Sequence, residues 1–318
     1  MPVFSASVPG KIILFGEHAV VYGYPAIAVP VSEVRVKAIV SPRIGINSGE
    51  IMIHAPDVGI HSYLDDLAIG NPLVEIVHQI KKTLDIERFP SCNIDISSTI
   101  PVAAGLGSGA AVSAAIIRAL SGFMGYPLPD ESVSRIAFEI EKLHHGTPSG
   151  IDNTVVVYNK PVYFIKDQPI EHIDPSESIT IVIGDTGIQC PTKETVGEVR
   201  EKRNHNTETI DRIFSAIGSI TKTARQSIEG GYPDRLGPLM DENHQLLKEL
   251  GMSSQELDHL VAAAKGAGAL GAKLSGGGKG GNIVALVKQS NAEKISTALT
   301  EAGAVKTFKT LIKKTEKK

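Results

Sequence analysis

The sequence has little cysteine, no long apolar run and no excess of one charge. Its only cysteines, Cys92 and Cys190, are too few for a disulfide framework, and neither has a partner at zinc-finger spacing. No stretch approaches the roughly 20 apolar residues of a membrane span, and the N-terminus lacks the basic and apolar regions of a signal peptide, so we expect a cytoplasmic protein. A formal net charge of −3 gives no general attraction to nucleic acid.

The pattern of strands and helices predicts an α+β fold with two domains. A chain of 318 residues is long enough for two medium-sized cores. Asn71 and Asp130 are candidate N-caps of two predicted helices. A polar stretch before residue 179 suggests a boundary, with domains at residues 1–178 and 179–318. Strand patterns cover residues 3–8, 11–16, 26–40, 92–98, 179–184, 271–274, 282–287 and 304–311, and helical patterns cover about 72–84, 108–124, 130–145, 192–229, 234–250, 254–265 and 291–302.

A glycine-rich segment runs directly into the predicted helix at residues 108–124. Its glycines allow positive φ angles and a close approach of the backbone to a ligand. The free N–H groups at the start of the following helix attract an anion. We interpret the segment as a cradle for a nucleotide phosphate. Its residues are Pro101, Val102, Ala103, Ala104, Gly105, Leu106, Gly107, Ser108, Gly109, Ala110 and Ala111.

Two other glycine motifs fit this segment less well. Residues 105–110 have the spacing of a relaxed dinucleotide-binding fingerprint, which belongs at the first strand of a βαβ unit with an acidic residue about 20 residues further on. Asp130 and Glu131 lie at that distance, but they follow prolines and begin another helical pattern. A Walker loop requires Gly-Lys followed by Ser or Thr, whereas Lys279 is followed by glycine.

Charged residues interrupt an apolar stretch near the N-terminus. Lys11 lies within a strand pattern, and Glu17 and His18 follow it. Each residue alone has an ordinary explanation, as a lysine that extends its ammonium to the surface or as part of a turn. Their clustering favours a functional role instead.

A third segment places two carboxylates around a turn rich in Gly, Pro and Ser. Glu141 lies on a late helical turn, and Asp152 follows residues 146–150. An isolated aspartate in such a place is most often a turn residue. The adjacent His144 and His145 lack the HExxH spacing or the cysteine partners of a zinc site, so we discard zinc.

The fourth segment, Lys273–Asn282 (KLSGGGKGGN), contains five glycines in ten residues. So much glycine costs backbone entropy and is unusual in an idle connection. A glycine-rich hairpin turn remains the alternative interpretation.

These four segments, in this order, resemble the GHMP small-molecule kinases, and among them the mevalonate kinase branch. The family's first motif resembles Pro9–Gly23, its phosphate loop Pro101–Ala111 and its third motif Lys273–Gly281. Residues 16–23 and 145–153 favour the mevalonate branch, because galactokinase, homoserine kinase and phosphomevalonate kinase share the glycine loop. The resemblance implies a two-domain GHMP kinase fold with the active site in the cleft between the domains. It also implies transfer of the γ-phosphoryl group of ATP to the C5 hydroxyl of mevalonate, and the homodimer common in the family.

The resemblance further implies roles for individual residues. Asp152 takes or orients the hydroxyl proton, and Lys11 pairs with Asp152 and attracts the developing charge. Glu141 and Ser108 hold Mg²⁺, a cation that prefers oxygen ligands. The family usually has a second serine where this chain has Gly109, so one hydroxyl is missing near the metal. The implied substrate contacts are Glu17, His18, Ser149, Gly150, Thr192, Gly276 and Gly277.

Three alternatives remain at this point. Another GHMP kinase, such as phosphomevalonate kinase, would use the same fold on a different acceptor. A catalytically silent GHMP-fold protein would bind nucleotide without forming product, although the intact Lys11, Glu141 and Asp152 argue against it. A nicotinamide oxidoreductase would bind a dinucleotide and show no dependence on magnesium.

Overall fold

The structure is a computed structural model that describes residues 2–44, 49–101, 104–145 and 149–315, without the side chains of residues 144 and 145. The predicted loop residues Val102 and Ala103 lie outside the described residues. The chain forms two compact units. Unit 1 comprises Met1–Gly10, Val34–Val102 and Leu106–Asn159, and unit 2 comprises Lys11–Glu33, Ala103–Gly105 and Lys160–Lys318. The sequence analysis predicted two continuous domains that meet at residue 178, whereas each compact unit consists of several segments of the chain. The boundary at residue 178 stays a prediction.

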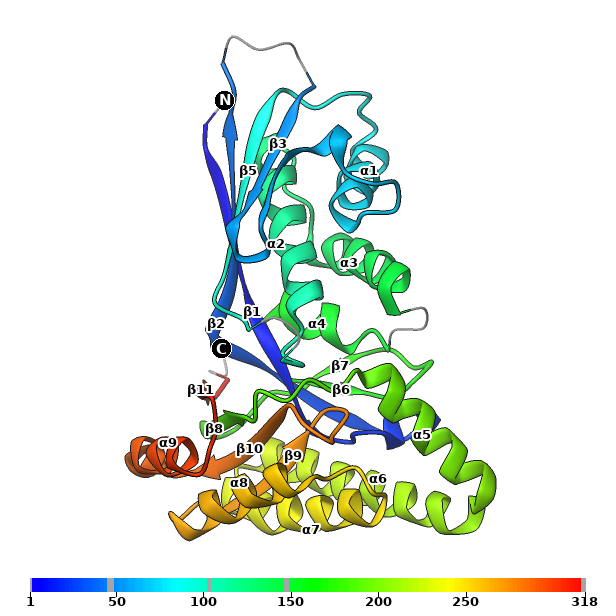
Figure 1. The fold of residues 1–318 in the computed structure, drawn as a ribbon, viewed down its shortest axis with the longest axis vertical. Helices are drawn as coiled ribbons and strands as arrows, with labels where there is room; N and C mark the ends of the chain where they lie inside the picture. The colour runs from blue at the N-terminus through cyan, green and yellow to red at the C-terminus, as the bar shows by residue number, and fades with distance from the viewer. Residues whose placement is uncertain (1, 45–48, 102–103, 146–148, 316–318) are drawn as a thin grey trace. The chain divides into compact units, whose positions relative to one another are not determined.

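Unit 1 is a sheet with helices on one face (Figure 1). Its strand order is β4-β3-β5-β2, and β1 pairs with β2. The pair β3–β5 is parallel, whereas β3–β4 and β2–β5 are antiparallel. Unit 1 contains the first part of β1 (Phe4–Phe15) and the last part of β2 (Ala26–Pro42). Its other strands are β3 (Ile51–Ala55), β4 (Ile60–Tyr63) and β5 (Cys92–Ser98), and its helices are α1 (Pro72–Leu84), α2 (Ser108–Phe123), α3 (Asp130–His145) and α4 (Ile151–Tyr158).

Two helix starts in unit 1 show how far cap chemistry could be anticipated. The predicted cap Asn71 is confirmed, because its Oδ1 accepts the N–H of Leu73 at 2.9 Å. The predicted cap Asp130 is wrong. The carbonyl of Pro129 accepts the N–H of Val133 at 3.0 Å, and the Asp130 carboxylate instead accepts a hydrogen bond from Arg118 on α2 at 2.7 Å.

The two strands predicted at residues 3–8 and 11–16 form one continuous strand, β1. Gly10, which lies between the two predicted strands, passes close to neighbouring residues. A Cβ atom at this position would lie 3.1 Å from both the carbonyl oxygen of Leu106 and a methyl group of Val34. Only glycine lets the backbone pass so close to its neighbours without displacing them.

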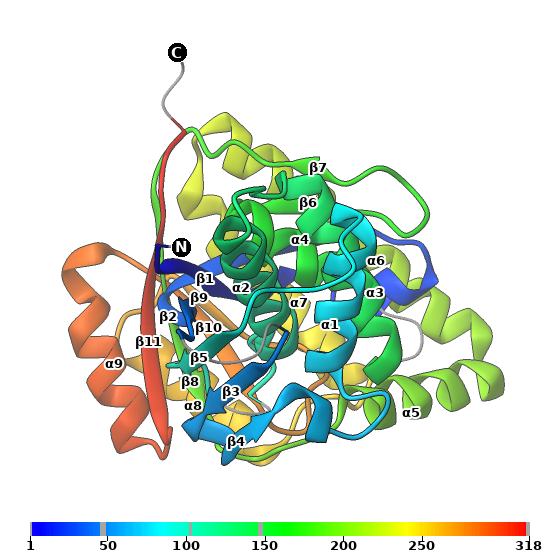
Figure 2. The same cartoon turned by 90° about the horizontal axis from the view of Figure 1, so that it is seen from above.

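Unit 2 contains an antiparallel sheet in the order β11-β8-β10-β9. Helices α8 and α9 pack on this sheet, and α9 lies beside β11 (Figure 2). The N-terminal end of β2 also pairs with β6 (Val162–Phe164), which pairs with β7 (Glu171–His172). The remaining elements are β8 (Ile179–Asp185), β9 (Gly271–Ser275), β10 (Asn282–Val287), β11 (Lys306–Ile312), α5 (Thr192–His205), α6 (Thr207–Gly230), α7 (Leu236–Glu249), α8 (Gln255–Gly266) and α9 (Ala292–Glu301).

The long helix predicted at residues 192–229 is divided into α5 and α6. Asn206 separates them with an extended φ of −147°, and its Oδ1 accepts the N–H of Thr209 at 3.2 Å as the cap of α6. None of the helices that the structure describes is long and apolar enough to cross a membrane.

Gly237 determines how closely α7 approaches β9. A Cβ atom on Gly237 would lie 2.2 Å from the carbonyl oxygen of Leu270, which is backbone and has little room to move. We expect Gly237→Ala to lower the free energy of unfolding by about 2–4 kcal/mol. Gly197→Ala is the matched control, because Gly197 lies inside α5 with open space around it. That variant should gain about 0.5–1 kcal/mol. Urea unfolding measures both, and equal values for the two variants would contradict the close approach.

Candidate active site

The described part of the predicted phosphate loop has the backbone of an anion cradle. Gly105 and Gly107 have φ angles of 71° and 72°, and Gly107 is the N-cap of α2. The N–H of Ala111 donates to the carbonyl of Gly107 at 3.0 Å, so this amide belongs to the helix. The amides of the first turn, at Ser108, Gly109 and Ala110, are the ones that an α-helix leaves for an anion.

Space at Gly109 does not explain its missing side chain. A Cβ atom there would meet nothing within 4 Å, and its φ is not in the left-handed region. A serine would therefore fit, and the departure from the family pattern changes the chemistry of the loop without changing its shape.

Within unit 2, Asn282 supports the start of the same loop. Its Nδ2 donates a hydrogen bond to the carbonyl of Ala104. The sequence analysis gave this residue no role. The available signal was its place directly after a run of glycines, which is too general to identify a contact 178 residues away.

In unit 1, Glu141 and Asp152 lie on two helices that pack together. Glu141 is buried near the end of α3, and Asp152 lies in the first turn of α4, which the sequence analysis missed. Gly150 caps α4 with a φ of 86°, and the Ser149 hydroxyl accepts the N–H of Ile151 at 3.3 Å. Asn153 fastens α4 to α3 by donating to the Ser134 hydroxyl at 2.8 Å.

The donor set of unit 1 fits Mg²⁺. The predicted ligands, Ser108 and Glu141, offer only oxygen atoms, which this hard cation prefers. In the part of the chain that the structure describes, no three His, Cys, Asp or Glu residues cluster as a metal site. Ser108 and Glu141 stay predicted ligands of Mg²⁺.

In unit 2, Glu17 and Lys273 form a buried ion pair. The side chains are 1% and 0% exposed, and Lys273 Nζ also donates to the carbonyl of Leu274 at 2.6 Å. Burial lowers the pKa of Lys273, and the neighbouring Glu17 carboxylate opposes this shift. The second oxygen of Glu17, Oε2, is buried and has no hydrogen-bond partner among the described residues.

His18 contacts the glycine-rich segment at residues 276–281, which lies near the other end of the sequence. Its Nε2 lies 3.0 Å from the carbonyl oxygen of Gly277 and donates to it. The φ of His18 is 60° with ψ −48°, a strained backbone that is typical of functional sites. Gly277 also approaches α5, since a Cβ atom there would lie 2.7 Å from the Thr195 hydroxyl and 3.5 Å from the Cα of Thr192. The structure therefore gathers three predicted substrate residues, His18, Thr192 and Gly277.

Burial lowers the pKa of His18 to about 4, although the hydrogen bond to Gly277 acts in the other direction. His18 is therefore neutral at pH 7.

Lys11, a predicted catalytic residue, is buried on β1. Gly16, which directly precedes Glu17, must be glycine because its φ is 97° and a Cβ atom would lie 2.4 Å from the carbonyl oxygen of Pro25.

His244 holds the strand that carries Lys273. Its Nδ1 accepts the N–H of Leu274 at 3.3 Å, and its Nε2 lies 3.2 Å from Asp258. Burial lowers the pKa of His244 to about 4, against the opposing effect of Asp258. This residue was not predicted, because a single histidine in a helical pattern carries no signal of its distant partners.

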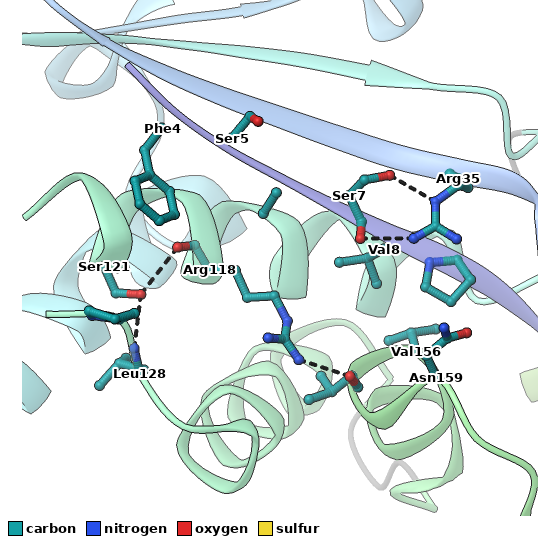
Figure 3. A pocket seen from close by; sticks show the side chains of 14 residues that line it. Phe4, Ser5, Ser7, Val8, Arg35, Arg118, Ser121, Leu128, Val156 and Asn159 are labelled. Carbon is teal, nitrogen blue, oxygen red and sulfur yellow. Dashed lines mark hydrogen bonds between the residues drawn. The ribbon is translucent and has the colours of Figure 1, made fainter. Parts of the chain in front are cut away.

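A separate pocket of about 370 Å³ lies in unit 1. It is formed by the start of β1, by α2 and by the end of α4, and Figure 3 shows Arg35 bound to Ser7 and the Arg118 side chain on its walls. The predicted site residues are absent from its lining, so we assign it no part in the candidate active site.

The comparisons with known proteins identify the family and the fold. The family model for the N-terminal domain of GHMP kinases matches residues 71–160, and that for the C-terminal domain matches residues 224–305. The mevalonate kinase of Thermococcus sibiricus is 37% identical, over 94% of this chain and 93% of that protein. The crystal structure of L. major mevalonate kinase in complex with R-mevalonate has a TM-score of 0.83 and 27% identity, over 98% of this chain and 96% of that chain. That of Methanococcus jannaschii mevalonate kinase has a TM-score of 0.84 and 26% identity, over 97% and 98%.

The fold is that of an ATP-dependent small-molecule kinase. The chain belongs to the GHMP kinases.

Removal of one partner from the buried ion pair should be costly. Lys273→Met leaves the Glu17 carboxylate buried without its counter-charge, and we expect a loss of about 3–5 kcal/mol in the free energy of unfolding. The double variant Glu17→Gln/Lys273→Met removes both charges and should recover a large part of that loss. Denaturant unfolding of the two variants measures the difference. A double variant that is less stable than Lys273→Met would contradict the coupling.

Neutral His244 should make stability depend on pH. Its pKa is about 4 in the folded protein and 6.5 when unfolded, so the unfolded state takes up the proton first as the pH falls. Between pH 6.5 and 4 this residue should remove up to about 3 kcal/mol of stability. His244→Gln has no such proton, and its unfolding free energy should decline less over this range. Parallel pH profiles for wild type and variant would show that the prediction is wrong.

Proposed function

We propose that this protein transfers the γ-phosphoryl group of ATP to the C5 hydroxyl of (R)-mevalonate, giving 5-phosphomevalonate and ADP. Curated relatives that cover 94% of the chain at 36–37% identity are named mevalonate kinases. The observation of the structure that carries the proposal is the group formed by Glu17, His18 and Gly277 in unit 2. Glu17 and His18 lie in residues 16–23, one of the two segments that favour the mevalonate branch.

The chemistry of this group suits a small hydroxy acid. The free Oε2 of Glu17 can accept a hydrogen bond from a substrate hydroxyl, and a buried acceptor without a partner is costly unless a ligand supplies one. Thr192, at the start of α5, adds a hydroxyl beside Gly277. Gly276, Ser149 and Gly150 complete the proposed substrate contacts.

Asp152 and Lys11 are the proposed catalytic residues. The Asp152 carboxylate accepts the proton of the C5 hydroxyl, the oxygen attacks the γ-phosphorus, and the bond from that phosphorus to the ADP oxygen breaks. Lys11 orients Asp152 and attracts the negative charge that develops on the reacting oxygen. Positioning and neutralisation of charge are the main requirements of phosphoryl transfer, and these residues supply both.

The first-turn amides of α2 are proposed to hold the phosphates of ATP, with Ser108 and Glu141 as the protein ligands of Mg²⁺. The metal ion would neutralise phosphate charge when bound. The absence of a hydroxyl at Gly109 leaves Ser108 as the hydroxyl ligand of this loop. A homodimer and a cytoplasmic location, which the family resemblance implies, belong to the same proposal.

Asp152→Asn tests the catalytic assignment. An amide cannot accept the hydroxyl proton, so we expect kcat to fall by a factor of about 10²–10⁴. The affinity for ATP should change by less than about threefold, because Asp152 is not proposed to contact the nucleotide. Steady-state ADP release and calorimetric titration with ATP measure the two quantities. Near-normal turnover in this variant would remove Asp152 from the mechanism, and ATP binding without turnover in the wild type would favour a silent binding protein.

A further inference from the structure

Lys279 lies in the glycine loop of residues 276–281, at a position where the backbone geometry favours glycine. Lys279 has a φ of 58°, in the left-handed region that side chains other than Gly, Asn and Asp seldom adopt. Its N–H donates to the carbonyl of Met252 at 2.8 Å. The backbone of Gly278 also packs against this carbonyl group, because a Cβ atom on Gly278 would lie 2.0 Å from its oxygen. The loop is therefore held tightly against the segment that follows α7.

The side chain of Lys279 forms an ion pair with Glu198 on α5. The other oxygen of Glu198 lies 3.0 Å from Lys202, one turn further along the helix. Lys202 in turn donates to the carbonyl of Leu250 at 2.9 Å. Glu198 is thus the centre of a network that joins α5, the glycine loop and the end of α7. Both lysines lower the pKa of the Glu198 carboxylate by their hydrogen bonds, which keeps it charged.

The other end of this loop carries the substrate-side contacts. Gly277 lies two residues before Lys279, and its carbonyl accepts the hydrogen bond from His18. Thr192 and Thr195 lie on the same helix as Glu198 and face Gly277. A shift of the loop relative to α5 would therefore move Gly277 away from the two threonines and displace the carbonyl that His18 contacts.

We propose that Glu198 is a positioning residue, which holds the glycine loop of residues 276–281 through Lys279 and so places Gly277 and His18 for the substrate. This inference rests on the proposed function for its substrate, but the tether itself does not. Single ion pairs at the surface contribute about 0.2–1 kcal/mol. Here one carboxylate serves two lysines, and Lys279 is already placed by its backbone, so less entropy is lost when the pair forms.

Glu198→Gln, Lys279→Gly and their combination test the tether. Lys279→Gly removes the ion pair while its backbone keeps a φ that glycine adopts freely. Glu201→Gln is the matched control, because Glu201 is an exposed acid on the same helix outside this network. The readouts are amide hydrogen exchange of residues 276–281 and the separate kcat and KM for mevalonate.

We expect Glu198→Gln to speed the exchange of these amides by about 3–10-fold and to raise the KM for mevalonate by a similar factor, with kcat changed by less than about twofold. Lys279→Gly should show a smaller change of the same kind. The double variant should match Glu198→Gln within about twofold, because the ion pair that Lys279→Gly removes is already lost in Glu198→Gln.

Exchange in Glu198→Gln that equals the Glu201→Gln control would overturn the tether. Faster exchange with an unchanged KM would overturn the positioning role. If the wild type does not phosphorylate mevalonate, the proposed function fails along with the substrate part of this inference, and the exchange measurement still decides whether Glu198 holds the loop.

Discussion

The buried ion pair between Glu17 and Lys273 is the interaction on which the proposed substrate site depends. Two charges without access to water are tolerated only when each has its partner, so the segment after β1 must meet β9 across 256 residues of sequence. The neighbouring contacts follow from this meeting. The Ser275 hydroxyl donates to the carbonyl of Ile13 at 2.7 Å, and His18 donates to Gly277. Residues 11–33 accordingly belong to the same compact unit as the C-terminal half.

The ion pair also explains why polar groups can be concentrated in this region. His244 is neutral and holds the backbone beside Lys273 on one side, and the neutral His18 contacts the glycine loop on the other. Neutral imidazoles add hydrogen bonds without adding buried charge. Among the described residues the second oxygen of Glu17 has no hydrogen-bond partner, in keeping with the substrate hydroxyl proposed for it.

Much of the fold could be predicted from local patterns, because these patterns act over a few residues. The Asn71 cap, the start of the helix at Ser108 and the strand at residues 282–287 are examples. The errors arose where a distant partner decides. Asp130 binds Arg118 instead of capping its own helix, and the break at Asn206 divides a pattern that reads as one helix.

The candidate site shows the same division. Lys11, Glu141 and Asp152 could be named from the sequence because they lie at characteristic positions in the motifs. Their roles stay predictions. Helix α4 was missed, because eight residues rich in valine after a Gly/Pro/Ser turn favour a strand. Glu198 and His244 were also missed, since their partners lie 81 and 30 residues away, and neither belongs to a recognisable motif.

The most direct test of this account is a coupled ADP-release assay with Mg²⁺ and ATP against mevalonate, phosphomevalonate, galactose and homoserine. We expect mevalonate to be phosphorylated in strong preference to the other three acceptors. Preference for another acceptor would contradict the assignment within the GHMP kinases, and ATP binding without turnover of any acceptor would contradict the catalytic role itself.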